Sequence, residues 1–576
     1  MESLTRQKAK AWVENHSIAP ADRQEIQELI EQLPASEAEL NDRFYRELEF
    51  GTGGMRGVRG AGENRINRYT VRRAAQALAS TLLKHFPGDA SIVVSYDSRH
   101  GSREYAEETC AVMAGNGIKS AIYPSLTPTP MLSFAIRHLG ARGGVMVTAS
   151  HNPPKYNGYK VFWADGAQVV PPMDGEIVRA FQALALTDVK HLPYPEACSR
   201  GLVRDVPPEV DEAFYRVIES KVMLLPAQNR ARGGELRVVY TPLHGTGLVP
   251  CELIARRLGF TNLHTLASQA RPDGDFPTVK YPNPEDPAAM ALAVNEMLKT
   301  DADLAFGTDP DCDRLGVVVN HRGEAVYPNG NQLGALFLHH ILKERQAQGS
   351  LPAKALVVKS IVTTPMQEAI AARFGAEVHA TLTGFKWMAG HIRELEEQRS
   401  GHTFVFASEE SFGYMPHAES RDKDGVSSVA LMCEIALAAK LRGQTLVDAL
   451  DALYEEYGFF QEHLVSLDYE GAAGAAKIKA IMARFRERAG AEFGDHRGTK
   501  VEDYLLGVRG LPTSDVLGLE FATGDRLFLR PSGTEPKIKF YVMVAITEGT
   551  LAEKKAAAAV RIETFERQIR RWCEDA

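Results

Sequence analysis

Four short polar loops hold the side chains of this 576-residue chain whose types and spacing best suit chemistry. In the first, TASHNPP (the serine loop, residues 148–154), Ser150 follows an apolar segment, and two prolines prevent a helix from starting there. Ser150 is therefore expected on a rigid, exposed turn. The plain alternative is a surface turn of small polar residues.

The chemistry of this serine can be narrowed further. A serine hydrolase is a poor fit, because the chain contains no G-x-S-x-G elbow. In addition, the neighbours Ser150 and His151 should point apart in an extended segment. A serine that carries a phosphoryl group fits the pattern better, given the next loop.

The second loop, GTDPDCDR (the aspartate loop, residues 307–314), places Asp309, Asp311 and Asp313 two residues apart. Three carboxylates this close repel one another unless a cation lies among them, and ligands that are all oxygen select Mg²⁺ or Ca²⁺. An EF-hand does not fit, because Arg314 and Asn320 stand where it needs glycine and glutamate. A solvated acidic turn is the alternative, although apolar segments on both sides predict buried strands. Mg²⁺ often completes its shell with phosphate oxygens, which a phosphoserine would supply.

Two further loops suit a sugar and a phosphate. SEESFG (the glutamate loop, residues 408–413) offers acceptors and a hydroxyl for sugar hydroxyls, and a helix N-terminus capped by Ser408 is an equally ordinary interpretation. RPSGTEPK (the arginine loop, residues 530–537) combines a guanidinium, two hydroxyls, a glycine and a lysine. That set suits a bound phosphate, and a polar hairpin turn is the alternative.

Internal repetition indicates which elements position these loops. Three segments, which begin at Ser91, Leu236 and Ala355, each predict a strand, a polar loop, an amphipathic helix, a glycine and a second strand. Each is followed by another apolar strand that ends in one of the first three loops. Strands that alternate with helices predict mainly parallel sheets, whose ligands gather beyond the carboxyl ends of the strands. The three loops are therefore expected at a common cleft.

The ends of the chain follow other patterns. The first fifty residues predict two polar helices, the second opened by a capping box between Ser36 and Glu39. After about Tyr454, alternating strands and two helices predict a smaller α+β domain with an antiparallel sheet. We therefore predict an α/β fold with three tandem similar domains, mainly parallel mixed sheets and a smaller C-terminal α+β domain around a central cleft. The expected domains are residues 1–207 with the helical extension and the serine loop, 208–323 with the aspartate loop, 324–454 with the glutamate loop, and 455–576 with the arginine loop.

Composition excludes several classes of protein. Hydrophobic residues make up 44% and charged residues 24% of the chain, as in ordinary globular proteins, and the net charge of −8 argues against a nucleic-acid partner. The six cysteines form no C-x-x-C pair, which fits a reducing compartment. No stretch approaches the roughly 18 apolar residues needed to cross a bilayer. We expect a cytoplasmic protein without a membrane partner.

Together, the four loops in this order resemble those of the α-D-phosphohexomutase superfamily, which contains the phosphoglucomutases and phosphomannomutases. The likeness runs from Gly51 to about Tyr541. The segments FGTGGMRG and TLTGFKW, the polar N-terminal extension and the length are most similar to one branch of it. That branch holds the bacterial α-phosphoglucomutases and the phosphoglucomutase/phosphopentomutase enzymes of animals.

The resemblance implies a role for each matching residue. Ser150 matches the phosphorylated serine, which is also a metal ligand, and the three aspartates match the Mg²⁺ ligands. Lys160, in YNGYK, is a candidate general acid/base, and Lys386 matches a substrate-contacting lysine. In some relatives a histidine follows the serine of the glutamate loop, whereas Gly413 stands here. The remaining matches are Glu409 and Ser411 to the sugar hydroxyls, Arg530, Ser532, Gly533 and Thr534 to the distal phosphate, and Arg56, His151 and Arg314 to the transferring phosphoryl group.

The implied activity is the interconversion of glucose 1-phosphate and glucose 6-phosphate through a phosphoserine enzyme and a bound sugar bisphosphate. The implied cofactors are one Mg²⁺ per chain and glucose 1,6-bisphosphate as activator and intermediate. The partners would be small sugar phosphates, and the sequence leaves the oligomeric state open. A phosphopentomutase, a phosphomannomutase or a glucose 1,6-bisphosphate synthase would use the same residues. A sugar-phosphate-binding protein without turnover is less consistent with a phosphorylatable serine beside a metal loop, and a metal phosphatase would need neither that serine nor the arginine loop.

Overall fold

The chain folds as two compact units. The computed structural model describes residues 4–51, 53–469, 471–489, 493, 496–532 and 537–575. Unit 1 comprises Met1–Tyr327, Phe385–Ser400 and Gly413–Ala438, and unit 2 comprises Pro328–Gly384, Gly401–Phe412 and Ala439–Ala576. The expected domain boundaries at 207, 323 and 454 stay predictions.

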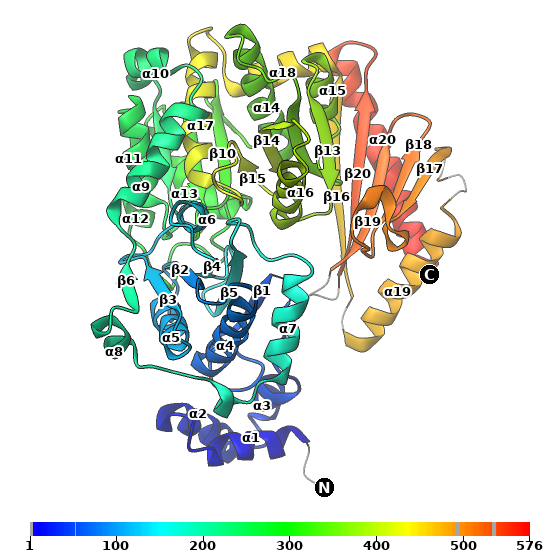
Figure 1. Ribbon diagram of the computed structural model, residues 1–576. Coiled ribbons are helices and arrows are strands. Elements are labelled where there is room, and N and C mark those ends of the chain that lie inside the picture. The colour runs from blue at the N-terminus through cyan, green and yellow to red at the C-terminus, as the bar shows by residue number, and fades with distance from the viewer. Residues whose placement is uncertain are drawn as a thin grey trace. The chain divides into compact units, whose positions relative to one another are not determined.

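Three helices begin unit 1, where two were expected: α1 (Leu4–Glu14), α2 (Pro20–Glu31) and α3 (Glu37–Phe44). They pack together (Figure 1), and the Trp12 ring meets Phe44 and Tyr69 edge-on at centroid distances of 5.9 and 5.4 Å. The predicted capping box is wrong. Ser36 precedes α3 with φ −89° and ψ 4° instead of the extended geometry of a cap, and its hydroxyl donates to the Leu29 carbonyl.

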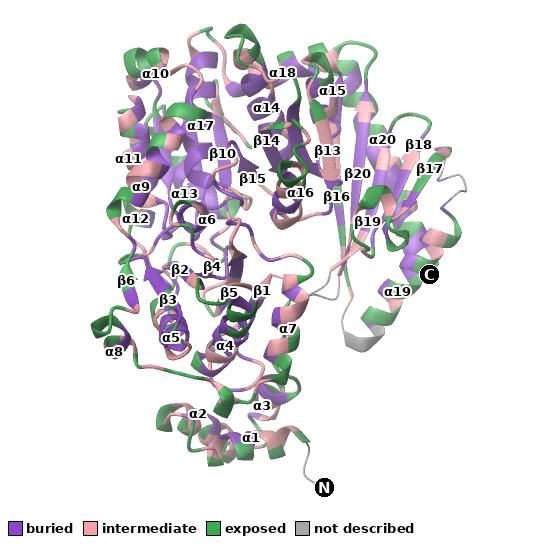
Figure 2. Cartoon of the chain, viewed as in Figure 1, coloured by how far each residue is buried: buried purple, intermediate pink, exposed green. Residues whose placement is uncertain are grey.

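The first sheet of unit 1 has the order β1-β5-β4-β2-β3-β6. Four of its strands are parallel, whereas β5 runs antiparallel to β4 and β1 antiparallel to β5. Helices α5 and α6 both pack against β2 and β4, whose side chains are almost all buried (Figure 2). The elements are β1 (Gly54–Val58), α4 (Arg68–His85), β2 (Ser91–Tyr96), α5 (Ser102–Gly115), β3 (Lys119–Ile122), α6 (Thr129–His138), β4 (Gly143–Val147), β5 (Tyr156–Trp163), α7 (Met173–Ala183), α8 (Tyr194–Ser199) and β6 (Val203–Asp205).

The second sheet of unit 1 has the order β11-β10-β9-β7-β8. β9, β7 and β8 are parallel, and β10 runs antiparallel to both β9 and β11. As predicted, the helix after β7 closes at Gly259, whose φ of 97° favours glycine. The elements of this part are α9 (Pro208–Val217), α10 (Pro226–Arg232), β7 (Val238–Thr241), α11 (Leu248–Leu258), β8 (Leu263–Thr265), α12 (Ala267–Ala270), α13 (Pro287–Lys299), β9 (Leu304–Thr308), β10 (Leu315–His321) and β11 (Glu324–Val326). Further along the chain, α16 (Phe385–Glu397), β15 (Gly413–Met415) and all but the last two residues of α17 (Gly425–Lys440) also belong to unit 1.

Unit 2 contains the third repeat and the C-terminal region. In the third repeat β12 lies between β13 and β14 and pairs parallel with both. The C-terminal sheet is antiparallel with the order β16-β20-β19-β18-β17, as expected. The elements are α14 (Gly330–Ala347), β12 (Ala355–Ser360), α15 (Met366–Arg373), β13 (Glu377–Thr381), β14 (Thr403–Glu409), α18 (Leu446–Tyr457), β16 (Phe459–Asp468), α19 (Gly471–Glu487), β17 (Gly498–Asp503), β18 (Leu517–Phe521), β19 (Arg526–Pro531), β20 (Lys537–Ile546) and α20 (Leu551–Glu574).

The fold class predicted from the sequence is thus confirmed, with tandem α/β layers followed by a β-rich C-terminal part. Within the described residues, every helix is too short or too polar to span a membrane.

Candidate functional site

Ser150 lies just beyond the carboxyl end of β4, in a backbone conformation that few residues adopt. Its φ is 51°, and its N–H donates to Thr148 Oγ1 at 2.9 Å. Two expectations are wrong here: Ser150 is only 3% exposed, and its Oγ lies 3.2 Å from His151 Nδ1. The left-handed φ explains the second, because neighbouring side chains point apart only in extended backbone.

Arg99, which sequence reasoning missed, holds the serine loop in this shape. Its guanidinium donates to the Ser150 carbonyl at 2.6 Å, to the Pro153 and Tyr156 carbonyls at 2.9 and 3.1 Å, and to the Asn152 carbonyl. Its Nε lies 3.3 Å from the buried carboxylate of Asp97, and Asp97 in turn accepts a hydrogen bond from Thr148 at 2.6 Å. The arginine therefore ties four backbone carbonyls to one buried acid. The polar segment Asp97–Arg99 after β2 was the only signal in the sequence.

The aspartate loop lies directly beside Ser150. Asp309 Oδ2 accepts from Ser150 Oγ at 3.0 Å, and Asp309 Oδ1 accepts from the backbone N–H groups of Asp313 and Arg314 at 3.1 and 3.0 Å. Asp311 is positioned from α6, because Thr129 donates to its Oδ2 at 2.8 Å. Unit 1 thus brings together the two loops that the sequence associated with phosphate and metal.

The three aspartates fit a hard divalent cation. All are at most 1% exposed, which rules out the solvated acidic turn, and they offer oxygens that lie within 4.8 Å of one another. Among the residues that the structure describes, Asp311 Oδ1 and Asp313 Oδ1 are buried without a hydrogen-bond partner. Burial of an unpaired carboxylate oxygen is costly, and a cation removes that cost.

The charges within the aspartate cluster also favour a bound cation. Burial, together with the carboxylates of Asp313 and Asp311, raises the pKa of Asp309 well above its ordinary value. Burial alone would also raise the pKa of Asp313, but Lys423, Lys160 and Arg314 lower it. The protein's own cations therefore neutralise only part of the cluster.

Besides Arg99, five basic residues lie in or beside the serine and aspartate loops. Lys160 Nζ lies 2.6 Å from Asp311 Oδ2 and 3.3 Å from Asp313 Oδ2; burial lowers its pKa, but these carboxylates raise it above the ordinary value.

The other basic residues contact different groups. Arg314 pairs with Glu285, and Arg56 donates to Asn152 Oδ1 at 2.9 Å. Burial, with Arg314 and Arg56 nearby, lowers the pKa of His151 well below its ordinary value. Sequence reasoning also missed Lys423, whose Nζ lies 3.1 Å from Asp313 Oδ2.

Lys386, the other predicted contact in unit 1, is on the first turn of α16. Burial lowers the pKa of Lys386, and Asp174 opposes that shift. Its Nζ lies 4.8 Å from the centroid of the Trp387 ring. Neither neighbour belongs to the serine or aspartate loops, so the role of Lys386 stays a prediction.

Residues 408–412 of the glutamate loop belong to unit 2, Gly413 belongs to unit 1, and the loop does not open a helix. Glu409 ends β14 and accepts a hydrogen bond from the Gly384 N–H, which excludes the interpretation of Ser408 as a helix cap. Gly330 is required beside this loop, because a Cβ there would lie 2.1 Å from the Glu410 carbonyl oxygen. Ser411 follows in the turn and is partly buried.

The arginine loop of unit 2 lies between two antiparallel strands, and this arrangement is compatible both with a polar turn and with the predicted phosphate site. Arg530 lies on β19, and the Ser532 N–H donates to the Lys537 carbonyl at 2.8 Å. The predicted phosphate contacts Gly533 and Thr534 lie outside the described residues. Burial raises the pKa of Tyr541 on β20, Glu409 adds to that shift, and a hydrogen bond with Arg530 opposes it. Tyr541 therefore lies within electrostatic range of Glu409 in the glutamate loop and of Arg530 in the arginine loop.

Comparison with known protein sequences identifies the family of this chain. The family described as phosphoglucomutase/phosphomannomutase, alpha/beta/alpha domains I, II and III, matches residues 47–188, 212–323 and 329–457. A phosphoglucomutase of Staphylococcus epidermidis is 35% identical over 525 residues, covering 89% of this chain and 93% of the relative. A phosphoglucomutase of Staphylococcus aureus is 36% identical over 516 residues, covering 88% and 91%.

Solved structures share the fold. The parafusin (phosphoglucomutase) of Paramecium aligns with a TM-score of 0.68 at 18% identity, over 92% of this chain and 96% of that one. A phosphoglucomutase/phosphomannomutase family protein of Burkholderia thailandensis aligns with a TM-score of 0.64 at 19% identity, over 91% and 97%. The chain belongs to the phosphoglucomutase/phosphomannomutase family, within the α-D-phosphohexomutases. It is a phosphosugar mutase, an enzyme of the isomerase class.

Proposed function

We propose that this enzyme interconverts glucose 1-phosphate and glucose 6-phosphate through a phosphoryl group carried on Ser150. The observation that carries the proposal is the 3.0 Å separation between Ser150 Oγ and Asp309 Oδ2, with Lys160 2.6 Å from Asp311 in the same cluster. A hydroxyl beside three buried acids and a lysine suits phosphoryl transfer, which requires positioning and charge neutralisation more than covalent chemistry. The preference for glucose follows the relatives named phosphoglucomutase.

Each transfer step forms one P–O bond and breaks another, and it moves one proton between the two oxygens. A sugar hydroxyl attacks the phosphorus on Ser150, a new P–O bond to the sugar forms, and the P–Oγ bond breaks. The sugar hydroxyl gives up a proton, and the serine oxygen that leaves gains one. The reverse step, from the other phosphate of the bisphosphate, restores phosphoserine and releases the isomeric sugar phosphate.

Residues of the chain position the serine, the phosphoryl group and the proton for this reaction. Arg99 fixes the serine, and Lys160, charged beside Asp311 and Asp313, is our candidate for moving the proton. Arg56, His151 and Arg314 surround the phosphoryl group. Bound Mg²⁺, held by Asp309, Asp311, Asp313 and an oxygen on Ser150, would supply charge neutralisation.

Unit 2 supplies recognition. Glu409 and Ser411 would accept and donate hydrogen bonds to sugar hydroxyls, and Lys386 of unit 1 would add a further contact. Arg530 and Ser532, with Gly533 and Thr534, would bind the phosphate that is not reacting. Because the bisphosphate must turn over between half-reactions, glucose 1,6-bisphosphate is expected to activate the enzyme. A cytoplasmic location, and the lack of nucleic-acid and membrane partners, stay predictions from the sequence.

Ser150→Ala tests the phosphoserine. The exposed Ser125 of the same unit provides a matched control, Ser125→Ala. Ser150→Ala should keep the fold, lose nearly all mutase turnover and lose the phosphate that peptide mass spectrometry finds in the purified protein. Full activity of Ser150→Ala, with phosphate mapped only to other residues, would refute the proposal.

Substrate choice separates glucose from its alternatives. Coupled assays with glucose, mannose and ribose 1-phosphates, each with and without glucose 1,6-bisphosphate, should give the highest kcat/KM for glucose 1-phosphate. Glu409→Ala should lower all three values and narrow the gap, since a site built to bind a hydroxyl penalises its displacement. If ribose 1-phosphate is better by an order of magnitude, the enzyme is a phosphopentomutase with the same catalytic residues.

A further inference from the structure

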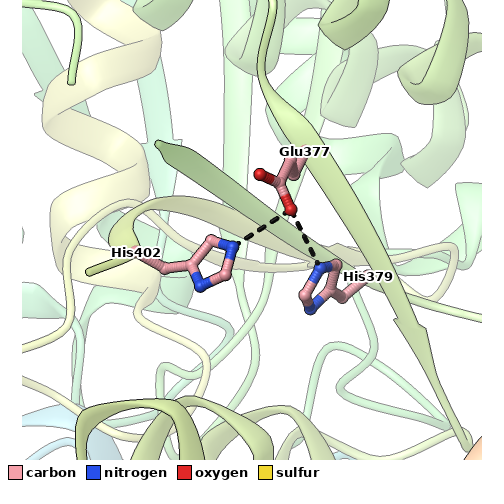
Figure 3. A group of neighbouring side chains, drawn as sticks. All are labelled: Glu377, His379 and His402. Carbon is pink, nitrogen blue, oxygen red and sulfur yellow. Dashed lines mark hydrogen bonds and ion pairs between the residues drawn. The ribbon is translucent and has the colours of Figure 1, made fainter. Parts of the chain in front are cut away.

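A second cluster of metal-ligating side chains lies in unit 2, apart from the aspartate loop. Glu377 and His379 are on β13, two residues apart and so on the same face of that strand. His402 directly precedes β14, the strand on the other side of β12. Figure 3 shows the two imidazoles turned toward the carboxylate of Glu377.

The distances suit a small metal ion. Glu377 Oε2 lies 3.0 Å from His402 Nε2 and 3.6 Å from His379 Nε2, and the three ligand atoms lie within 4.8 Å of one another. Tetrahedral Zn²⁺ has ligands at about 2.0–2.2 Å, so pairs of its ligand atoms are about 3.3 Å apart. Two contacts are already near that spacing, and only the imidazole nitrogens need to move together.

Charge and packing support the same site. The carboxylate of Glu377 supplies the negative charge that favours a cation, and its Oε2 faces both imidazoles. His402 is 14% and His379 30% exposed at the side chain, so both are partly shielded, whereas the Glu377 side chain is 52% exposed and leaves an approach for an ion. The imidazole rings lie 5.5 Å apart at 65°. A single histidine would satisfy an ordinary ion pair, and the second one completes a set of three ligands.

We propose that Glu377, His379 and His402 form a binding site for one divalent transition-metal ion, with Zn²⁺ the best match. Two imidazoles and one carboxylate select Zn²⁺ and its neighbours over Mg²⁺ and Ca²⁺, the opposite preference to the aspartate loop. Three protein ligands leave a fourth position for water. The ion would link the starts of β13 and β14 across β12.

The site is separate from the proposed sugar contact of the same unit. His402 and Glu409 lie at opposite ends of β14, and seven residues of extended strand span about 23 Å. Zinc at the histidines would therefore leave the glutamate loop free. Its expected effect is on the stability of unit 2, because a ligand that binds only the folded state stabilises it.

The test uses the full chain, stripped with a chelator and then held in excess Mg²⁺ so that the hard-cation site is occupied. Calorimetric titration with Zn²⁺ should give one ion per chain, and zinc should raise the melting temperature. X-ray absorption at the zinc edge should show imidazole nitrogen in the coordination shell. Zinc bound only through oxygen, or no zinc bound in excess Mg²⁺, would overturn the proposal.

Single substitutions locate the ion. His379→Ala and His402→Ala should each weaken zinc binding roughly 100-fold, since loss of even an outer-shell partner costs about 10–100-fold. Glu377→Gln removes the charge and keeps the volume, so it serves if His402→Ala fails to fold. His264→Ala, at an exposed histidine on β8 of unit 1, is the control and should bind zinc like the parent. Equal affinity in His379→Ala, Glu377→Gln and the control would exclude this site.

Discussion

Replacement of Arg99 by lysine should slow catalysis without weakening substrate binding. The two Nη atoms of Arg99 serve four carbonyls of the serine loop, and its Nε faces Asp97. Lysine keeps the positive charge near Asp97, but its single nitrogen cannot reach both sides of the loop. Arg99→Lys therefore keeps the ion pair with Asp97 and removes the planar guanidinium that donates to several carbonyls at once.

The magnitude follows from the hydrogen bonds that lysine cannot make. A hydrogen bond from a charged donor contributes about 1.5–3 kcal/mol, so the absence of two lowers the free energy of unfolding by about 3–6 kcal/mol at most. A displacement of the reacting oxygen by about 1 Å costs roughly 100-fold in rate, or about 2.7 kcal/mol of barrier. Arg99 is buried and its guanidinium faces the backbone of the serine loop, so it acts on the substrate only through Ser150. We therefore expect kcat to fall about 100-fold while KM changes less than about threefold.

The assay is steady-state mutase kinetics combined with single-turnover phosphorylation of Ser150 by glucose 1,6-bisphosphate. Arg103→Lys provides the control, because Arg103 is a half-exposed arginine on α5 that donates to Tyr96 and Glu107 instead of the serine loop. Circular dichroism and thermal melting show whether each variant is folded. A folded Arg99→Lys enzyme with unchanged kcat, or with a raised KM alone, would refute the positioning role.

Three further predictions concern the metal, the phosphate and the pH. Asp311→Asn should weaken Mg²⁺ binding in calorimetric titration and lower kcat more than it raises KM; equal Mg²⁺ affinity would contradict the metal role. Arg530→Ala should raise KM and the requirement for added bisphosphate, whereas Lys160→Met should mainly lower kcat, so identical kinetic changes would argue against separate roles. Burial raises the pKa of Glu462 on β16 from 4.5 to about 7 in the folded protein. Between these two pH values the unfolded chain ionises this carboxyl more readily than the folded one, so the free energy of unfolding falls as pH rises. Glu462→Gln should thus be more stable than the parent by about 3 kcal/mol at pH 8 and lose that advantage at pH 4.5 in denaturant titrations; equal stability at both pH values would exclude this cost.

The repeats were predictable because each rests on local signals. Apolar strands, polar loops and helix-ending glycines such as Gly259 follow one another within about 30 residues, and the structure places the elements accordingly. β17 was not predicted, because half of its residues are exposed on an edge strand and the strand carries no apolar alternation. The capping box predicted at Ser36 is wrong for a different reason: the residue types are suitable, but the backbone is not extended there.

In the site, residue types were predictable and conformations were not. The acidic spacing of the aspartate loop predicts a cation site without any knowledge of the fold, and the structure brings the three carboxylates together. The left-handed φ of Ser150 cannot be inferred from a serine, and it reverses the expected relation to His151. Arg99 and Lys423 lie about 50 and 110 residues from the groups they contact, so only the folded chain reveals them.

Gly158 on β5 limits how this sequence can change. Any other amino acid would place a Cβ 2.3 Å from the Thr148 carbonyl oxygen, two residues before the serine that is proposed to carry phosphate. Because every side chain adds this atom, even alanine meets the clash, and no gradual series of substitutions leads away from glycine. Mutational drift at this position is thus blocked by backbone geometry alone, and a lineage that lost the activity would still need glycine for as long as it kept the turn.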